Sequence, residues 1–164
     1  ALGAMADKIG DHILVTHSAG GFPGWISAMD NPEVKGVVAL EPGGFVFPEN
    51  EVPSPLPGLT GGLAGVPVAT ARFMELTRKP VAIYFGDYIP ESGATTLGGS
   101  NWEVRLKMAR EFVDAINRHG GHATLVELPK IGITGNSHFL MQELNNDVIA
   151  DHIAEWLIEN NLSK

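Results

Sequence analysis

The sequence predicts an α/β fold with a mainly parallel sheet and flanking helices. Short apolar runs bounded by Gly, Pro, Asn or Asp alternate along the chain with longer stretches of helical periodicity. Polar side chains that can carry chemistry follow the apolar runs directly, and ligands bind at the carboxyl ends of the strands in such sheets. With 164 residues, 44% of them hydrophobic, the chain is long enough for one domain with its own core.

The first predicted elements surround a serine. Residues 1–8 are typical of the end of a helix that Gly10 would cap, so we expect the chain to begin in the middle of a fold. Residues 13–15 predict a buried strand that ends at Ser18, because the run is too short for a helix and turn formers flank it. Residues 22–29 then predict a helix.

Further strands and helices follow along the chain. The apolar runs at 34–40 and 81–86 predict strands, which end at Glu41 and Asp87, and a fourth strand is predicted at 123–128. Three segments have the composition or apolar spacing of helices: 69–77, 102–119 and 147–159.

Residues 41–80 are rich in loops. The part from Pro42 to Pro67 holds six of the eleven prolines in the chain. Long irregular segments with apolar content are often lids or binding loops, so this region predicts a lid or a pocket insertion. A packed surface loop is the alternative.

The composition excludes several classes of function. The formal charge of −8, without a Lys/Arg cluster, argues against nucleic acid or an anionic membrane surface as partner, and a small neutral substrate fits better. No apolar run approaches the roughly 20 residues that span a bilayer. The chain has no cysteine, which excludes thiol catalysis and cysteine-ligated zinc. We expect a soluble protein without metal or cofactor, whose compartment stays open, with secretion or the periplasm among the options.

Ser18 stands at a tight turn of small residues. Ala19, Gly20 and Gly21 allow a sharp reversal from strand to helix that exposes the serine hydroxyl. This arrangement resembles the nucleophile elbow of the α/β-hydrolases. The usual elbow pattern is G-x-S-x-G, and here Thr16 occupies the first glycine position. The motif alone is therefore also compatible with a turn that carries no chemistry.

A serine nucleophile needs a base, and the sequence offers six histidines. His138 follows the last predicted strand, at the sheet edge where Ser18 must lie. His17 directly precedes the serine, and strand alternation should turn its side chain away from Ser18. The other four lie at the wrong end of the sheet or on a helix face: His12, His119, His122 and His152. The sequence therefore predicts His138 as the base.

Two carboxylates are candidates for the acid that orients this base. Asp87 ends the strand before the histidine strand, which is the commoner position in α/β-hydrolases. Glu41 ends the strand directly after the elbow, a position that some lineages use. The residues alone leave the choice open, and Asp87 could instead cap its loop or contact substrate.

Three stretches carry further motifs in a fixed order: 16–21 (Thr-His-Ser-Ala-Gly-Gly), 40–43 (Leu-Glu-Pro-Gly) and 135–142 (Gly-Asn-Ser-His-Phe-Leu-Met-Gln), with Asn145 and Asn146. Together they resemble a family of bacterial serine esterases of the α/β-hydrolase fold, from the elbow to the end of the chain. The resemblance implies a triad of Ser18, Glu41 and His138, with Asp87 as second choice for the acid. It also implies several strands before the elbow, so that 1–164 is expected to be the carboxyl-terminal part of a single α/β-hydrolase domain.

Such a part is expected to need the amino-terminal part of the same protein, as a second chain or as a missing segment. The backbone N–H of Ala19 would be one oxyanion donor, and the second donor is expected from an earlier loop. Whether the protein forms a homo-oligomer stays open.

The predicted function is hydrolysis of carboxylic esters through an acyl-enzyme. A small ester would bind in an apolar or aromatic pocket to which Phe45, Phe47 and Trp102 contribute. An amidase, a lactonase or an acyltransferase could use the same triad. The alternative from another class is a non-catalytic α/β-hydrolase relative that binds a ligand or a protein.

Overall fold

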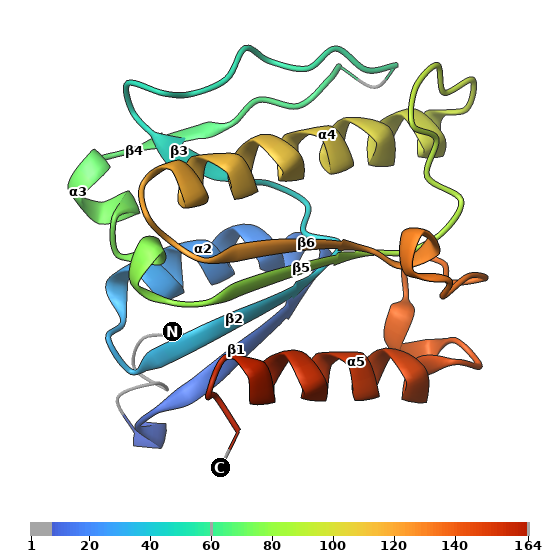
Figure 1. The fold of residues 1–164 in the computed structure, drawn as a ribbon. Coiled ribbons are helices and arrows are strands. Elements are labelled where there is room, and N and C mark those ends of the chain that lie inside the picture. Colours follow the sequence, from blue (N-terminus) through green and yellow to red (C-terminus); the bar gives the residue numbers. More distant parts are fainter. Residues whose placement is uncertain (1–7, 60, 164) are drawn as a thin grey trace.

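The structure is a computed structural model that describes residues 8–59 and 61–163 (Figure 1). The helix predicted at 1–8 therefore lies outside the described residues, except for its last position. Gly10 has a positive φ of 74°, the left-handed conformation that is typical of the residue after a helix.

Within the described residues, four parallel strands form the main sheet in the order β1-β2-β5-β6. All four predicted strands are present: β1 (His12–His17), β2 (Val34–Leu40), β5 (Val81–Phe85) and β6 (Ala123–Glu127). The strands run in one direction, so their carboxyl ends meet at one edge of the sheet. Ser18, Glu41 and Gly86 each follow a strand at this edge.

Helices cover both faces of the sheet (Figure 1). The helices α2 (Gly21–Asp30) and α4 (Leu97–Arg118) lie on one face, and α5 (Asn146–Glu159) lies on the other. Helix α4 begins at Leu97 rather than near 102, because the side chain of Thr96 caps it by accepting a hydrogen bond from the Gly99 N–H. The predicted parallel sheet with flanking helices is thus confirmed, and the fold is of the α/β-hydrolase type.

The strands send alternate side chains into two apolar cores. In β2, Val37 and Ala39 belong to the core beneath α2 and α4, whereas Val38 and Leu40 belong to the core beneath α5. Strand β5 is buried on both faces in the same way. Burial of both faces explains why these strands are continuous apolar runs.

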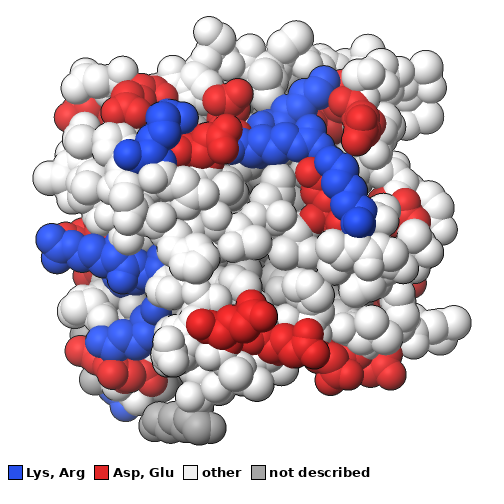
Figure 2. All heavy atoms as spheres, in the orientation of Figure 1, with Lys and Arg blue, Asp and Glu red and all other residues white. Residues whose placement is uncertain are grey.

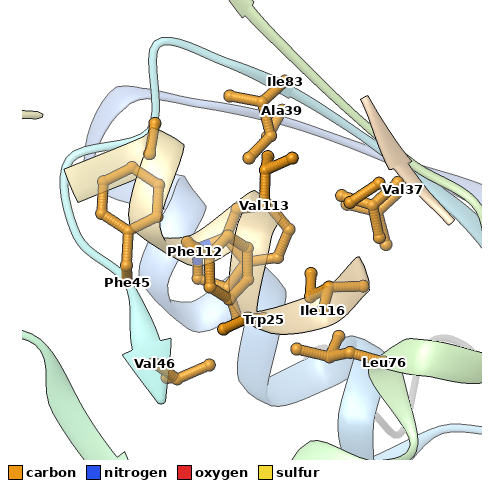
Figure 3. Packing of buried hydrophobic residues seen from close by; sticks show 14 of the residues in the cluster. Trp25, Val37, Ala39, Phe45, Val46, Leu76, Ile83, Phe112, Val113 and Ile116 are labelled. Carbon is orange, nitrogen blue, oxygen red and sulfur yellow. The ribbon is translucent and has the colours of Figure 1, made fainter. Parts of the chain in front are cut away.

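An aromatic cluster fills the larger core (Figure 3). The ring of Phe112 in α4 lies with its centroid 4.8 Å from Trp25, 5.4 Å from Phe45, 5.9 Å from Phe47 and 6.2 Å from Phe73. The prediction that Phe45 and Phe47 bind substrate is wrong in this structure, because each is only 1% exposed and packs in this core.

The loop-rich region 41–80 contains regular structure that the proline content concealed. It forms a separate two-stranded parallel sheet, followed by a short helix and a 3₁₀ turn: β3 (Val46–Pro48), β4 (Val66–Val68), α3 (Thr70–Phe73) and Leu76–Arg78. The strand β3 packs against α4 and α3. Part of the region is therefore a packed layer, and a role of the remainder as a lid stays a prediction.

Charged side chains are mixed on the face shown in Figure 2, where Lys and Arg lie among Asp and Glu. An acidic row follows the outer face of α5, with exposed carboxylates at every fourth position: Asp147, Asp151, Glu155 and Glu159. None of the described helices combines the length and the apolar character needed to cross a membrane.

Candidate active site

Ser18 occupies a strained turn at the end of β1. Its φ is +54°, in the left-handed region that side chains other than glycine seldom adopt, and a 3₁₀ turn (Ser18–Gly20) leads directly into α2. The Ser18 carbonyl accepts a hydrogen bond of 2.8 Å from the Gly43 N–H in the loop after β2. The turn is thereby fixed to the neighbouring strand, with the hydroxyl at the sheet edge.

Glu41 follows β2 and is also held in a left-handed conformation, with φ +41°. Its carboxylate is buried, at 2% exposure, so both oxygens need partners. One oxygen accepts the Gly86 N–H at 2.7 Å, and the other lies 2.7 Å from Nδ1 of His138. A Cβ at residue 86 would lie 3.0 Å from the carboxylate, so Gly86 keeps room for it.

His138 lies between the two residues. Its Nε2 is 2.9 Å from Oγ of Ser18, while its Nδ1 faces Glu41. With Nδ1–H donating to the carboxylate, Nε2 carries the lone pair that can accept the serine proton. The ring of Trp102 in α4 lies against the imidazole, with 4.2 Å between the centroids.

Asp87, the other candidate for the acid, is directed elsewhere. Its carboxylate accepts hydrogen bonds from the Tyr88 N–H at 2.7 Å and from the Gly135 N–H at 2.9 Å. The bond from Gly135, followed by that from Tyr88, lowers the pKa of Asp87 below its ordinary value. Asp87 thus ties the loop that carries His138 to the end of β5, and Glu41 is the carboxylate that reaches the imidazole.

A cavity of about 350 Å³ opens beside Ser18. Its other lining residues come from the elbow, the loop after β2 and the first turns of α4: Ala19, Phe22, Gly43, Gly44, Asn101, Trp102 and Arg105. Ala19 and Trp102 were predicted for this region from the sequence, whereas Asn101 and Arg105 were not. Within the described ranges, no group of three or more His, Asp or Glu side chains could hold a metal ion.

Comparison with known proteins finds the same fold in a solved structure. No protein-family model matches the chain. A solved structure of a bacterial esterase matches this chain with a TM-score of 0.75 and 32% sequence identity. The match covers 99% of this chain and 42% of the esterase chain. The chain resembles the bacterial α/β-hydrolase esterases. The resemblance predicted from the three sequence motifs is thus confirmed.

A curated fungal protein named "Probable secreted lipase phiG" is 26% identical over 176 residues, which cover 94% of this chain and 48% of the lipase. The chain therefore spans less than half the length of both the lipase and the bacterial esterase.

The α/β-hydrolase elbow is built here with its glycines in unusual places. Thr16 stands at the first motif position, and the space for it comes from Gly24 in α2, where an added Cβ would lie 2.6 Å from the Thr16 methyl group. At Gly21 an added Cβ would lie 2.5 Å from Cβ of Pro42. At Gly20, the second motif position, an added Cβ meets nothing within 4 Å among the described residues. Close packing in this elbow thus depends on Gly21 and Gly24.

His17, which strand alternation is predicted to turn away from Ser18, contacts His138. The loop that carries His138 lies against the His17 side chain. His17 Nε2 donates a hydrogen bond of 2.9 Å to the His138 carbonyl, and the two rings lie 4.5 Å apart. Strand periodicity could not reveal this contact, because a loop 121 residues away in the sequence supplies the partner.

Asparagines hold the loop around His138. Asn136 is fully buried, and its side-chain amide donates to Oδ1 of Asn145 at 2.6 Å. The Asn145 amide in turn donates to the Thr134 carbonyl at 3.2 Å, and the Asn136 carbonyl accepts the Asp87 N–H at 2.8 Å. The asparagines in the sequence motif therefore position the loop, whereas the imidazole faces the serine.

Proposed function

We propose that this chain hydrolyses carboxylic esters through an acyl-enzyme, with Ser18 as nucleophile, His138 as base and Glu41 as the acid that orients it. The observation that carries the proposal is the continuous set of contacts from Ser18 Oγ through the imidazole to the buried carboxylate, at 2.9 and 2.7 Å. The names of the two similar proteins, an esterase and a lipase, favour esters over amides or lactones as substrates.

In the first half-reaction, Oγ of Ser18 attacks the acyl carbon while Nε2 of His138 takes the hydroxyl proton. The carbonyl π electrons move to oxygen and give a tetrahedral oxyanion. The imidazolium is stabilised by the Glu41 carboxylate, and the face of Trp102 lies against it. The backbone N–H of Ala19 is the proposed donor to the oxyanion.

The intermediate collapses when the C–O bond to the alcohol breaks and Nε2–H of His138 protonates the leaving oxygen. Water then enters, loses a proton to the same nitrogen and attacks the acyl-enzyme. Release of the carboxylic acid returns the proton to Ser18 Oγ. Each half-reaction contains two proton transfers, so the imidazole is neutral again at the end. The only co-reactant that is consumed is water.

Covalent labelling tests this proposal. We expect a fluorophosphonate to add one adduct mass to the purified protein, with peptide mapping that places it on Ser18. The Ser18→Ala variant should take up no adduct and lose esterase activity by at least about 10³-fold, since the remaining rate would come from binding and oxyanion contacts alone.

Ser92→Ala is a matched control, because Ser92 is an exposed hydroxyl in the loop before α4. It should be labelled and active like the wild type. Labelling of Ser18→Ala to the same extent as the wild type, or an unlabelled wild type without activity toward activated esters, would contradict the proposed function and favour a binding role.

A further inference from the structure

Arg105 is a charged residue in the wall of the cavity beside Ser18. It lies in the third turn of α4 and is half-buried. Its guanidinium carbon lies 5.3 Å from the centroid of the Trp102 ring, and that ring lies against His138. Arginine, indole and imidazole thus form one side of the proposed reaction site.

The charge of Arg105 has no carboxylate partner among the described residues. Its hydrogen bonds come from Nη1 alone and go to Asn101, to the backbone carbonyl at 2.8 Å and to the side-chain oxygen. A guanidinium has five N–H donors, so those on Nε and Nη2 are available to a ligand. Burial lowers the pKa of Arg105, yet a guanidinium stays charged at neutral pH.

The other basic residues of α4 differ in this respect. Lys107, Arg110 and Arg118 each pair with a glutamate, at 2.5, 2.9 and 3.5 Å. The buried Lys79 also has no carboxylate, but its ammonium group is satisfied by two backbone carbonyls. Arg105 therefore combines partial burial, a missing counter-charge within the described chain and a position in the cavity wall.

We infer that the substrate is an ester that carries a carboxylate, and that Arg105 binds this carboxylate while Ser18 attacks the ester carbonyl. The inference rests on the proposed function and names the substrate class for that site. A planar guanidinium can bind a carboxylate through two parallel hydrogen bonds. The Asn101 carbonyl and the Trp102 ring both contact the Arg105 guanidinium and so fix its position. The overall charge of −8 favoured a neutral substrate, but the cation in the cavity wall outweighs it locally.

Two pairs of esters test the inference. The first pair is mono(4-nitrophenyl) glutarate and the neutral 4-nitrophenyl pentanoate, which place or omit a carboxylate on the acyl side. The second pair is 4-acetoxybenzoate and phenyl acetate, which do the same on the alcohol side. For each pair the ratio of kcat/KM, charged over neutral, is compared between the wild type and Arg105→Gln.

We expect the ratio in at least one pair to fall about tenfold to a hundredfold in Arg105→Gln, as for loss of a charged hydrogen bond. Arg105→Lys should retain part of the preference for the charged ester, since lysine keeps the positive charge but lacks the two parallel N–H donors of the guanidinium. The ratio cancels any general loss of activity in a variant. Arg118→Gln makes the same charge change on the same helix, away from the cavity, and should keep the wild-type ratio.

The two proposals fail in different ways. Hydrolysis of both members of each pair, with ratios that are the same in Arg105→Gln and wild type, would overturn the substrate class and leave the esterase. A wild type that hydrolyses none of the four esters and takes no fluorophosphonate on Ser18 would overturn the proposed function and the substrate class together.

Discussion

Ser18 and Glu41 share an unfavourable backbone conformation. Both have positive φ, at 54° and 41°, and each directly follows a parallel strand. A strand that ends in an abrupt left-handed residue turns its last side chain out over the sheet edge instead of into a core. Surrounding contacts offset the energetic cost: the Gly43 N–H donates to the Ser18 carbonyl and the Glu41 N–H donates to the Tyr84 carbonyl, each at 2.8 Å.

A comparison of two carboxylate-to-amide variants tests the assignment of the acid. Glu41→Gln should lower kcat by about 10³- to 10⁴-fold, because an amide neither fixes the imidazole tautomer nor stabilises the imidazolium. Asp87→Asn should lower kcat by about tenfold or less, since its Oδ1 can still accept from a backbone N–H. Initial rates with 4-nitrophenyl butyrate, and the rate of fluorophosphonate labelling, measure both effects. A larger loss in Asp87→Asn would make Asp87 the acid.

The single residues of the site differ in how far the sequence could predict them. Ser18 and His138 could be selected because each lies at a strand end or in the loop after one, which is a local property of the chain. Glu41 and Asp87 could not be separated by position, because both follow a strand at the same edge. The choice depends on the direction of each carboxylate, which the contacts with Gly86 and Gly135 determine.

At the scale of elements, strand β1 and helix α2 pack closely enough to need a glycine between them. Gly24→Ala should destabilise the protein by about 1 to 2 kcal/mol. The new methyl group would lie 2.6 Å from the Thr16 methyl group, and the free energy of this steric overlap exceeds the gain in helix propensity from alanine. In a Thr16→Ser background, which removes that methyl, the same change should be neutral or stabilising. Urea unfolding of the four proteins gives the coupling free energy.

Gly20→Ala is the control for this cycle. It also adds a methyl in the elbow, but nothing among the described residues lies within 4 Å of it, and its φ of −67° suits alanine. Its unfolding free energy should match the wild type within about 0.5 kcal/mol. A coupling free energy near zero between positions 16 and 24 would show that the elbow relaxes without cost.

The elements that could not be predicted from the sequence lack the hydrophobic periodicity of a helix or a strand. The first turn of α4 contains Gly98 and Gly99, which are poor helix formers, and a cap at Thr96 starts it. The strands of the small sheet have three residues each, which is too short for an alternation of apolar and polar residues to be recognised. Phe45 and Phe47 could not be assigned to the core from their neighbours, because the helix that buries them begins only at Leu97.

At the scale of the whole molecule, Tyr84 joins the sheet to α5 through the smaller core. Its ring is fully buried, and its hydroxyl lies 3.0 Å from Nδ1 of His152. Burial raises the pKa of Tyr84 from 10.0 to about 12. The folded state therefore disfavours the phenolate, which the unfolded chain forms freely. The stabilising contribution is complete below pH 10 and is lost as the pH rises from about 10 to 12.

The two tyrosines of the chain make this measurable. We expect the unfolding free energy of the wild type to fall by up to about 3 kcal/mol more than that of Tyr84→Phe between pH 9 and 12. Tyr88 is 75% exposed, so Tyr88→Phe should keep the wild-type dependence. Denaturant midpoints at a series of pH values provide the comparison. Parallel pH profiles for Tyr84→Phe and the wild type would contradict it.

The two ends of the proposed triad are attached to the molecule in different ways. Ser18 and Glu41 belong to neighbouring strands and move with the sheet, whereas His138 depends on a loop held by Asp87 and asparagine side chains. Loops generally open locally at a lower free energy than the unfolding of a buried sheet requires. We therefore expect that a fully folded preparation can contain molecules in which His138, the proposed base, has moved away from Ser18. For such a protein, titration of reactive serines counts competent molecules, whereas an unfolding curve counts all of them.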